Sequence, residues 1–169
     1  EENLANGTVI TALATTDLDG DTEHVYSLVA GEGDTNNSFF AISTGNLITA
    51  SDFNFESKSD FTIRLRTTDP HGLFFEKSFT INISDVNEAP SAMVIGSSAI
   101  AENLSVNSPI GSFVSTDQDA NDTHTYSLVS GSGDADNASF KIEGNQLLSN
   151  AIFDFESKSS FSVLIRTTD

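Results

Sequence analysis

The chain of 169 residues contains no cysteine and no tryptophan, and it has only two tyrosines and three prolines. Because cysteine is absent, no disulfide framework can hold the fold. No apolar run reaches the roughly 18 residues of a membrane-spanning helix, and no basic segment followed by an apolar one predicts a signal peptide. The sequence therefore predicts no membrane insertion.

Basic residues are also scarce. The chain has 7 lysines and arginines against 25 aspartates and glutamates, which gives a net charge of -18. Nucleic acids and anionic membranes repel such a surface, so neither is an expected partner. Metal cations are the natural counterions of this chain.

The residues of most catalytic centres are missing too. The histidines are His24, His71 and His124, and none has the His-x-x-x-His or Glu-x-x-His spacing of a zinc site. His24 and His124 occupy equivalent positions in a sequence repeat and are expected at the surface of the scaffold. We expect no enzymatic activity.

What the chain does have is an internal repeat with an offset of 100 residues and no insertion. The matching runs are ENL at 2–4 and 102–104, YSLV at 26–29 and 126–129, FESKS at 55–59 and 155–159, and RTTD at 66–69 and 166–169. A period of this length is that of a domain array, because solenoid units span about 20 to 50 residues. The repeat predicts two domains, residues 1–90 and 91–169, joined by the run DVNEAP at 85–90.

The two copies are out of phase at their ends. Residues 92–101 precede the second copy and have no counterpart before Glu2, whereas residues 73–84 extend the first copy and have no counterpart after Asp169. We therefore expect the first domain to lack its first strand and the second to lack its last, with further copies on both sides in a longer protein.

Alternation of apolar and polar residues dominates each copy, as in FTIRLR at 61–66 and FTINI at 79–83. A period of two residues indicates antiparallel strands that are buried on one face. Strands are expected at 9–14, 25–29, 39–42, 47–49, 61–67 and 75–83. Short strands separated by Gly/Asp/Asn turns predict an all-β fold, a sandwich of about seven strands per domain. Most of the 13 phenylalanines, together with Tyr26 and Tyr126, are assigned to its core and core edge.

Five acidic motifs stand in order along the first copy: EN at 2–3, DLD at 17–19, FNFE at 53–56, TD at 68–69 and DVNEAP at 85–90. They resemble the calcium motifs of cadherin repeats, and the resemblance covers essentially the whole chain. In particular, the chain resembles the bacterial cadherin-like domains that occur in tandem in large surface and secreted proteins. The resemblance implies two tandem Greek-key, immunoglobulin-like β-sandwiches that act outside the cell, as part of a surface or secreted protein.

The resemblance also implies that Ca²⁺ binds at the joint between successive domains. Calcium takes six to eight oxygen ligands at about 2.3–2.6 Å, which loop carboxylates, amide side chains and carbonyls supply. The ligands implied are Glu2, Asn54, Glu56, the Val86 carbonyl, Asn87, Glu88 and the Ala89 carbonyl from the first domain, and Asp117, Asp119, Asp169 and a carbonyl of the 121–122 turn from the second. By the same analogy, Asp85 supports a ligand and does not bind the ion itself.

Two positions depart from the family pattern, because Asn54 and Glu88 stand where the family usually has aspartate. They weaken the site on the first domain, whereas Asp117, Asp119 and Asp169 keep the pattern. We expect two calcium ions at the joint and leave a third open. Incomplete half-sites are expected at Asp17, Asp19 and Asp69 and at Glu102, Asp154 and Glu156.

Other interpretations of these motifs stay open. Loop aspartates and asparagines are usually turn residues that bind local backbone. An EF-hand loop fits poorly, because Thr22 and Leu28 stand where that loop needs Gly and Glu. The expected function is a calcium-stiffened adhesion or spacer module whose partners are adjacent repeats and a homophilic or heterophilic protein. The alternative is a calcium-dependent carbohydrate-binding module of a bacterial surface or polysaccharide-active protein.

Overall fold

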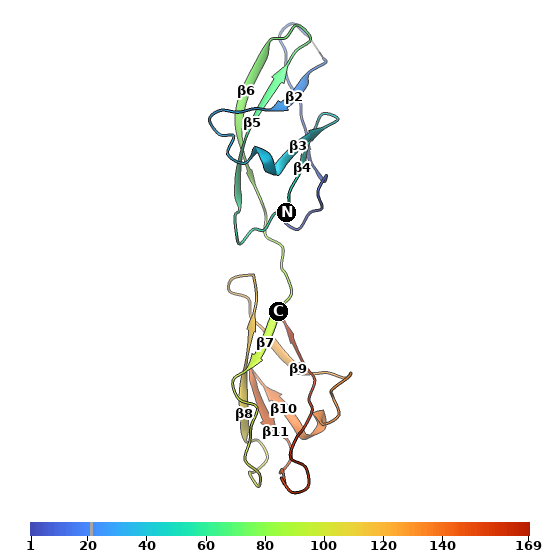
Figure 1. Ribbon diagram of the computed structural model, residues 1–169, viewed down its shortest axis with the longest axis vertical. Coiled ribbons are helices and arrows are strands. Elements are labelled where there is room, and N and C mark those ends of the chain that lie inside the picture. Colours follow the sequence, from blue (N-terminus) through green and yellow to red (C-terminus); the bar gives the residue numbers. More distant parts are fainter. Residues whose placement is uncertain (21) are drawn as a thin grey trace. The chain divides into compact units, whose positions relative to one another are not determined.

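The computed structural model describes residues 1–20 and 22–169 and contains two compact units, Glu1–Val86 and Asn87–Asp169. Within the described residues, the regular elements are antiparallel strands and two single-turn 3₁₀ helices (Figure 1). The expected all-β class is therefore confirmed.

The first unit has two sheets, with strand orders β1-β4-β3 and β2-β5-β6. Its elements are β1 (Val9–Ala12), β2 (Val25–Leu28), η1 (Asn37–Phe39), β3 (Phe40–Ser43), β4 (Asn46–Thr49), β5 (Asp60–Thr68) and β6 (Phe74–Asn82). Alternate residues of β5 enter the core: Phe61 and Ile63 are almost completely buried, and they pack with Phe40 and Leu47 of the opposite sheet. The two sheets therefore form a sandwich.

The second unit has a four-stranded sheet of order β10-β11-β8-β7 and a two-stranded sheet of order β12-β9. Its elements are β7 (Ala92–Ile95), β8 (Pro109–Thr116), β9 (Thr125–Leu128), η2 (Asn137–Ser139), β10 (Phe140–Glu143), β11 (Gln146–Ser149) and β12 (Ile165–Thr168). Its core contains Phe113, Phe140, Leu147 and Phe153, and Tyr126 stacks on Phe113 with ring centroids 5.2 Å apart. An immunoglobulin-like sandwich has a four-stranded and a three-stranded sheet. The second unit contains a four-stranded sheet, and the sheets of the first unit are three-stranded.

Strands β1 and β12 are shorter than the equivalent strands of the other unit, β8 and β5. In both cases the shorter strand lacks a neighbouring strand with which the longer one pairs. β8 continues to Thr116 because its last four residues pair with β7, whereas β1 ends at Ala12. β5 begins at Asp60 because its first residues pair with β6, whereas β12 begins only at Ile165. The expected strand over 9–14 is therefore too long by two residues, since a strand needs a ladder partner as well as an apolar pattern.

An ion-pair cluster lies on the outer face of the first unit. Arg64 donates to Glu76 Oε2 at 2.8 Å, and Arg66 donates to Glu76 Oε1. These hydrogen bonds lower the pKa of Glu76 from its usual value of 4.5, and the bond from Arg64 has a larger effect than the bond from Arg66. The fold is thus stabilised by the ionised form of Glu76. This contribution is complete above the usual carboxyl pKa and is lost as the pH falls through the lowered one.

We predict that Glu76→Gln lowers the unfolding temperature at neutral pH and flattens its decrease on acidification. Thermal unfolding followed by circular dichroism from about pH 7 to about pH 3 measures both effects. Arg66→Gln should act in the same direction, and Arg166→Gln, at the equivalent position of the second unit, is the control. Equal pH profiles for the Glu76 variant and the original chain would exclude this role.

Candidate metal centre

Carboxylates gather in groups of three within each unit. The members of a group each offer one oxygen, and these oxygens lie within 4.8 Å of one another. Within a single unit and among the described residues, the groups are Glu2, Glu56 and Asp85 in the first unit, and Asp117, Asp122 and Asp169, and Glu102, Asp154 and Glu156, in the second.

Glu2 anchors the group of the first unit. It is 2% exposed, and its two oxygens accept hydrogen bonds from Phe55 N at 2.8 Å and Val86 N at 3.0 Å. The carboxylate of Glu2 thus connects the start of the unit to the FNFE turn and to the beginning of the linker. Asn3 follows in the left-handed conformation, with φ of 56°, which asparagine tolerates better than most residues.

Asp85 is itself a member of this group. Its carboxylate forms the group with Glu2 and Glu56, although the family analogy gave Asp85 only a supporting role. The geometry is compatible with a direct ligand. The role of Asp85 as a direct ligand stays a prediction.

The side chain of Asn54 serves its own turn. Its Oδ1 accepts a hydrogen bond from Ser57 N at 2.7 Å. The equivalent Asp154 accepts from Ser157 Oγ at 2.8 Å, and hydrogen bonds from Ser157 lower the pKa of Asp154. Asn54 and Asp154 therefore form hydrogen bonds within their own turns, as ordinary turn residues do. The role of Asn54 as a metal ligand stays a prediction.

The linker-proximal group of the second unit contains a residue that the sequence did not single out. Asp122 was considered only for a carbonyl of its turn, yet its carboxylate joins those of Asp117 and Asp169. Its Oδ2 atom is buried and accepts no hydrogen bond from any described residue. A buried, unpartnered carboxylate oxygen is costly, so this atom fits a cation ligand.

The other oxygens of this group are held by local hydrogen bonds. Asp117 Oδ2 is hydrogen-bonded to His124 Nε2 at 3.0 Å, and Asp117 Oδ1 accepts from Asp119 N at 3.3 Å. The bond to His124 is the largest of the effects that lower the pKa of Asp117. Asp117 is therefore ionised at neutral pH, as a calcium ligand must be.

Linker residues are bound to the same end of the second unit. Asn87 Nδ2 donates to Asp169 Oδ2 at 2.5 Å, and Glu88 N donates to Asp119 Oδ2 at 2.7 Å. All four residues were predicted as ligands, and the structure brings them together in these two pairs. The carboxylates of Asp119 and Asp169 thus hold the start of the second unit.

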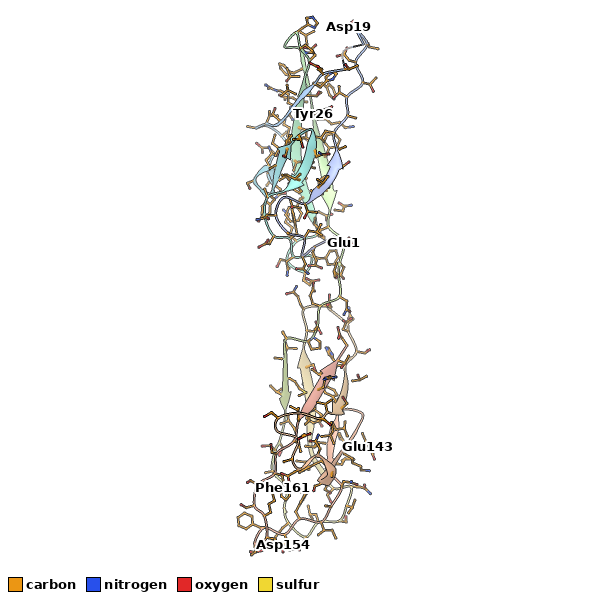
Figure 2. The ribbon with its side chains drawn as sticks, turned by 90° about the vertical axis from the view of Figure 1, so that its right-hand side faces the viewer. Glu1, Asp19, Tyr26, Glu143, Asp154 and Phe161 are labelled. Atoms are coloured by element: carbon orange, nitrogen blue, oxygen red, sulfur yellow. The ribbon has the colours of Figure 1, made fainter. Side chains whose placement is uncertain are left out.

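Among the described residues, the half-site of the first unit (Asp17, Asp19 and Asp69) forms a less complete carboxylate group than Asp117, Asp122 and Asp169 in the second unit. Asp17 Oδ1 accepts from Asp19 N at 2.8 Å, and this bond is the main cause of the lowered pKa of Asp17. Figure 2 shows Asp19 at the end of this unit opposite Glu1. Within residues 1–20 and 22–86, the carboxylates of Asp17, Asp19 and Asp69 form no group of three. Thr22 stands where the second unit has Asp122, so the third carboxylate is absent from that position.

The half-site of the second unit does come together. Glu102 Oε2 accepts from Phe155 N at 2.9 Å, which repeats the bond between Glu2 and Phe55. Asp154 and Glu156 complete the group, in a loop that Figure 2 shows at one end of the unit. This group has the same all-carboxylate composition as the others.

The chain was compared with known protein families, curated proteins and solved structures. No family model matches the chain. Protocadherin Fat 2 of Mus musculus is 26% identical over 133 residues, which are 75% of this chain and 3% of that protein. The chain therefore spans only a small part of this curated relative.

Solved structures match over nearly the full chain. The structure of human protocadherin-24 EC1-2 (form II) has a TM-score of 0.74 and 24% identity, over 98% of this chain and 79% of that one. Protocadherin gamma B7 extracellular cadherin domains 1–4 give a TM-score of 0.64 and 25% identity, over 99% and 42% of the two chains. The chain folds as cadherin-like repeats.

The cadherin-like fold and the chemistry of the carboxylate groups both bear on which ion these groups suit. Cadherin extracellular repeats usually bind calcium and mediate adhesion, and they are not enzymes. Groups composed only of carboxylate oxygens suit a hard cation such as Ca²⁺, whereas Zn²⁺ sites favour nitrogen and sulfur ligands. No helix among the described residues is long and apolar enough to cross a membrane. The bacterial source suggested by the sequence stays a prediction.

Proposed function

We propose that this pair of cadherin-like repeats is an extracellular adhesion or spacer module in which Ca²⁺ binds at the 85–90 linker and stiffens it. One observation carries the proposal: each unit has a group of three carboxylates next to its own end of the linker. In the first unit this group includes Asp85, and in the second the linker residue Asn87 is bonded to Asp169 of the group.

The mechanism follows from charge. Without a cation, the carboxylates of each group repel one another, and the net charge of -18 adds a general repulsion between the units. Bound Ca²⁺ removes this repulsion and takes ligands from the linker and from both repeats. Because ligands come from separate units, the binding free energy stabilises one relative orientation.

Two ions are expected, with Asp117, Asp119 and Asp169 contributing from the second unit, Glu2 and Glu56 from the first unit, and Glu88 from the linker. Asp122 is an additional ligand in this proposal because its Oδ2 is buried without a partner among the described residues. A third ion would need Asn54, whose Oδ1 already accepts from Ser57 N.

The proposed function of the module is mechanical. Neighbouring repeats of a longer protein are its direct partners, and the stiff linker holds an adhesive end at a distance from the cell. Homophilic or heterophilic protein contact would occur at that end. One of the matching structures is described as a cis-dimer of protocadherin gammaB7 EC3-6, at a TM-score of 0.57.

Thermal unfolding with and without Ca²⁺ tests the proposal. Calcium at about 100 times its dissociation constant should stabilise the chain by about 2.7 kcal/mol for each independent site. Asp122→Asn should reduce this stabilisation, and Asp60→Asn, an exposed carboxylate outside the groups, is the matched control for charge. Equal calcium stabilisation of both variants would contradict the assignment.

The carbohydrate-binding alternative has less support, because the exposed aromatic side chains of the described residues are phenylalanines, such as Phe74, Phe75 and Phe155, which carry no polar group. Sugar recognition usually uses exposed aromatic platforms, but the chain has no tryptophan, and Tyr26 and Tyr126 are half-buried. A glycan array with and without Ca²⁺ separates the two functions. A reproducible calcium-dependent sugar signal would favour the alternative.

A further inference from the structure

Three hydroxyl groups meet between the two sheets of the second unit. Ser115 Oγ on β8 donates to the Tyr126 hydroxyl on β9 at 3.1 Å and is also hydrogen-bonded to Thr167 Oγ1 on β12 at 2.6 Å. All three side chains are half-buried. Because β8 belongs to the four-stranded sheet and β9 and β12 to the two-stranded sheet, this hydroxyl triad connects the two layers of the sandwich.

The hydroxyl triad precedes the group of Asp117, Asp122 and Asp169 along two strands. Asp117 follows Ser115 by two residues, and Asp169 follows Thr167 by two residues. In an extended chain, side chains two residues apart point to the same side and lie about 7 Å apart. The bond between Ser115 and Thr167 therefore holds together the two strand ends that carry Asp117 and Asp169.

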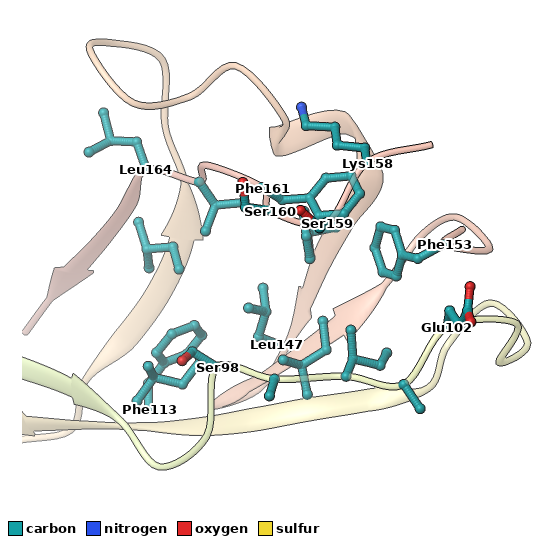
Figure 3. Close-up of a pocket in the computed structure, with 18 of the residues that line it drawn as sticks. Ser98, Glu102, Phe113, Leu147, Phe153, Lys158, Ser159, Ser160, Phe161 and Leu164 are labelled. Carbon is teal, nitrogen blue, oxygen red and sulfur yellow. The ribbon is translucent and has the colours of Figure 1, made fainter. Parts of the chain in front are cut away.

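The third strand of the triad is connected to the same group. His124 lies two residues before Tyr126 and is hydrogen-bonded to Asp117 Oδ2 at 3.0 Å. The Tyr126 ring stacks on Phe113 of β8, with centroids 5.2 Å apart, and Figure 3 shows Phe113 with the core residue Leu147. The hydroxyl triad thus connects the strand ends beside the carboxylates to the hydrophobic core.

The triad is placed to control the spacing of the carboxylates. The oxygens of Asp117, Asp122 and Asp169 lie within 4.8 Å of one another. Two oxygens bound to the same Ca²⁺ lie at most about 5 Å apart, because each Ca–O distance is about 2.3–2.6 Å. The strand ends therefore have a separation that one ion can bridge.

The first unit contains the same triad, with threonine in place of serine. Thr15 Oγ1 donates to the Tyr26 hydroxyl at 3.1 Å and is hydrogen-bonded to Thr67 Oγ1 at 2.8 Å. Asp17 and Asp69 follow Thr15 and Thr67 by two residues, but within residues 1–20 and 22–86 they belong to no group of three carboxylates. The repeat thus supplies a matched copy of the triad without the adjacent group.

We propose that the hydroxyl triad of the second unit positions the calcium ligands: it does not touch the ion, but it sets the separation of Asp117 and Asp169 and thereby the affinity of the site. This inference rests on the calcium binding of the proposed function. Groups that orient metal ligands typically contribute about 10- to 100-fold to metal affinity. The alternative is that the triad only satisfies the hydrogen bonds of hydroxyls between the sheets.

Thr167→Val and Thr67→Val separate these two roles, because they make the same change in matched triads. Each variant loses one hydroxyl and keeps a side chain of similar size. In excess chelator, both should lower the unfolding temperature of the full chain by similar amounts. In a calorimetric calcium titration, Thr167→Val should weaken binding at least about tenfold, whereas Thr67→Val should leave the affinity unchanged. Equal calcium affinities of the two variants would contradict the positioning role.

Ser115 provides a test by rescue. Ser115→Ala removes both hydrogen bonds of this hydroxyl and should weaken calcium binding at least about tenfold. Ser115→Thr introduces the residue that the first unit has at Thr15, so it should keep the bonds and an affinity close to that of the original chain. Equally weak binding by the alanine and threonine variants would show that the hydroxyl is not the cause.

A double-mutant cycle shows whether the triad acts through its carboxylates. Asp169→Asn removes the charge that Thr167 positions. In an Asp169→Asn background, Thr167→Val should therefore weaken calcium binding much less than it does in the original chain. Full additivity of the two substitutions would count against the proposed positioning.

The same titrations separate this role from the proposed function. An original chain that binds no calcium would contradict both. A chain that binds calcium with the same affinity after Thr167→Val and after Ser115→Ala would contradict the role of the triad alone.

Discussion

Replacing Phe53 by alanine should destabilise the first unit by about 3–5 kcal/mol. Phe53 is 2% exposed, and its ring contacts those of Phe40 and Phe61 at centroid distances of 5.4 and 4.9 Å. Alanine would leave a cavity between the two sheets, where the surrounding rings cannot collapse fully. Because a small domain has only about 5–15 kcal/mol of stability, this loss is a large share of the total.

Urea unfolding followed by circular dichroism measures the change, and the chain provides its own control. Phe155, two residues beyond the repeat counterpart of Phe53, is 64% exposed, so Phe155→Ala should alter stability by no more than about 0.5 kcal/mol. Phe53→Leu retains much of the volume and should fall between the two. Equal stabilities of Phe53→Ala and Phe155→Ala would mean that the core is not the one described.

Asp117→Ala should weaken calcium binding by at least about tenfold, because it removes one negative oxygen ligand from the group with Asp122 and Asp169. The carboxylate also orders its loop through the bonds to His124 and Asp119 N. Calorimetric titration with Ca²⁺ gives the affinity, and circular dichroism shows whether the unit stays folded.

Asp17→Ala is the matched control for this variant. Asp17 has the same bonds in the first unit, to His24 at 3.4 Å and to Asp19 N at 2.8 Å, but belongs to no group of three carboxylates among the described residues. Both variants therefore lose hydrogen bonds to a histidine and to a backbone N–H, but Asp17 belongs to an expected half-site without a group of three described carboxylates, whereas Asp117 belongs to such a group. Equal calcium affinities of the two variants would exclude Asp117 as a ligand.

The fold was largely predictable because its signals are local and repeated. Alternation in FTIRLR fixed the faces of β5, and the structure buries Phe61 and Ile63 as that pattern requires. The ends of strands were less predictable, since β1 and β12 end or begin where their neighbours stop pairing. Pairing depends on a distant segment, so a local pattern does not contain this information.

The candidate site was predictable as a set of motifs but not in its detail. The family resemblance predicted that Glu2 lies near Glu56 and that Asp117 lies near Asp169, and the structure groups both pairs. Asp122 was missed as a side-chain ligand because an acidic residue in a turn looks like an ordinary turn residue. Only three-dimensional placement shows that its Oδ2 is buried without a partner in the described structure. The one cue in the sequence was the difference between Thr22 and Asp122 in otherwise similar loops.

In the proposed function, calcium fixes the linker between the two cadherin-like repeats. The most direct measurement is a calorimetric calcium titration combined with small-angle X-ray scattering of the calcium-free and calcium-loaded forms of the same sample. We expect two or three ions to bind, and we expect the distribution of interdomain distances to become narrower and its mean to increase. Calcium binding without any change in the scattering, or no calcium binding at all, would contradict it.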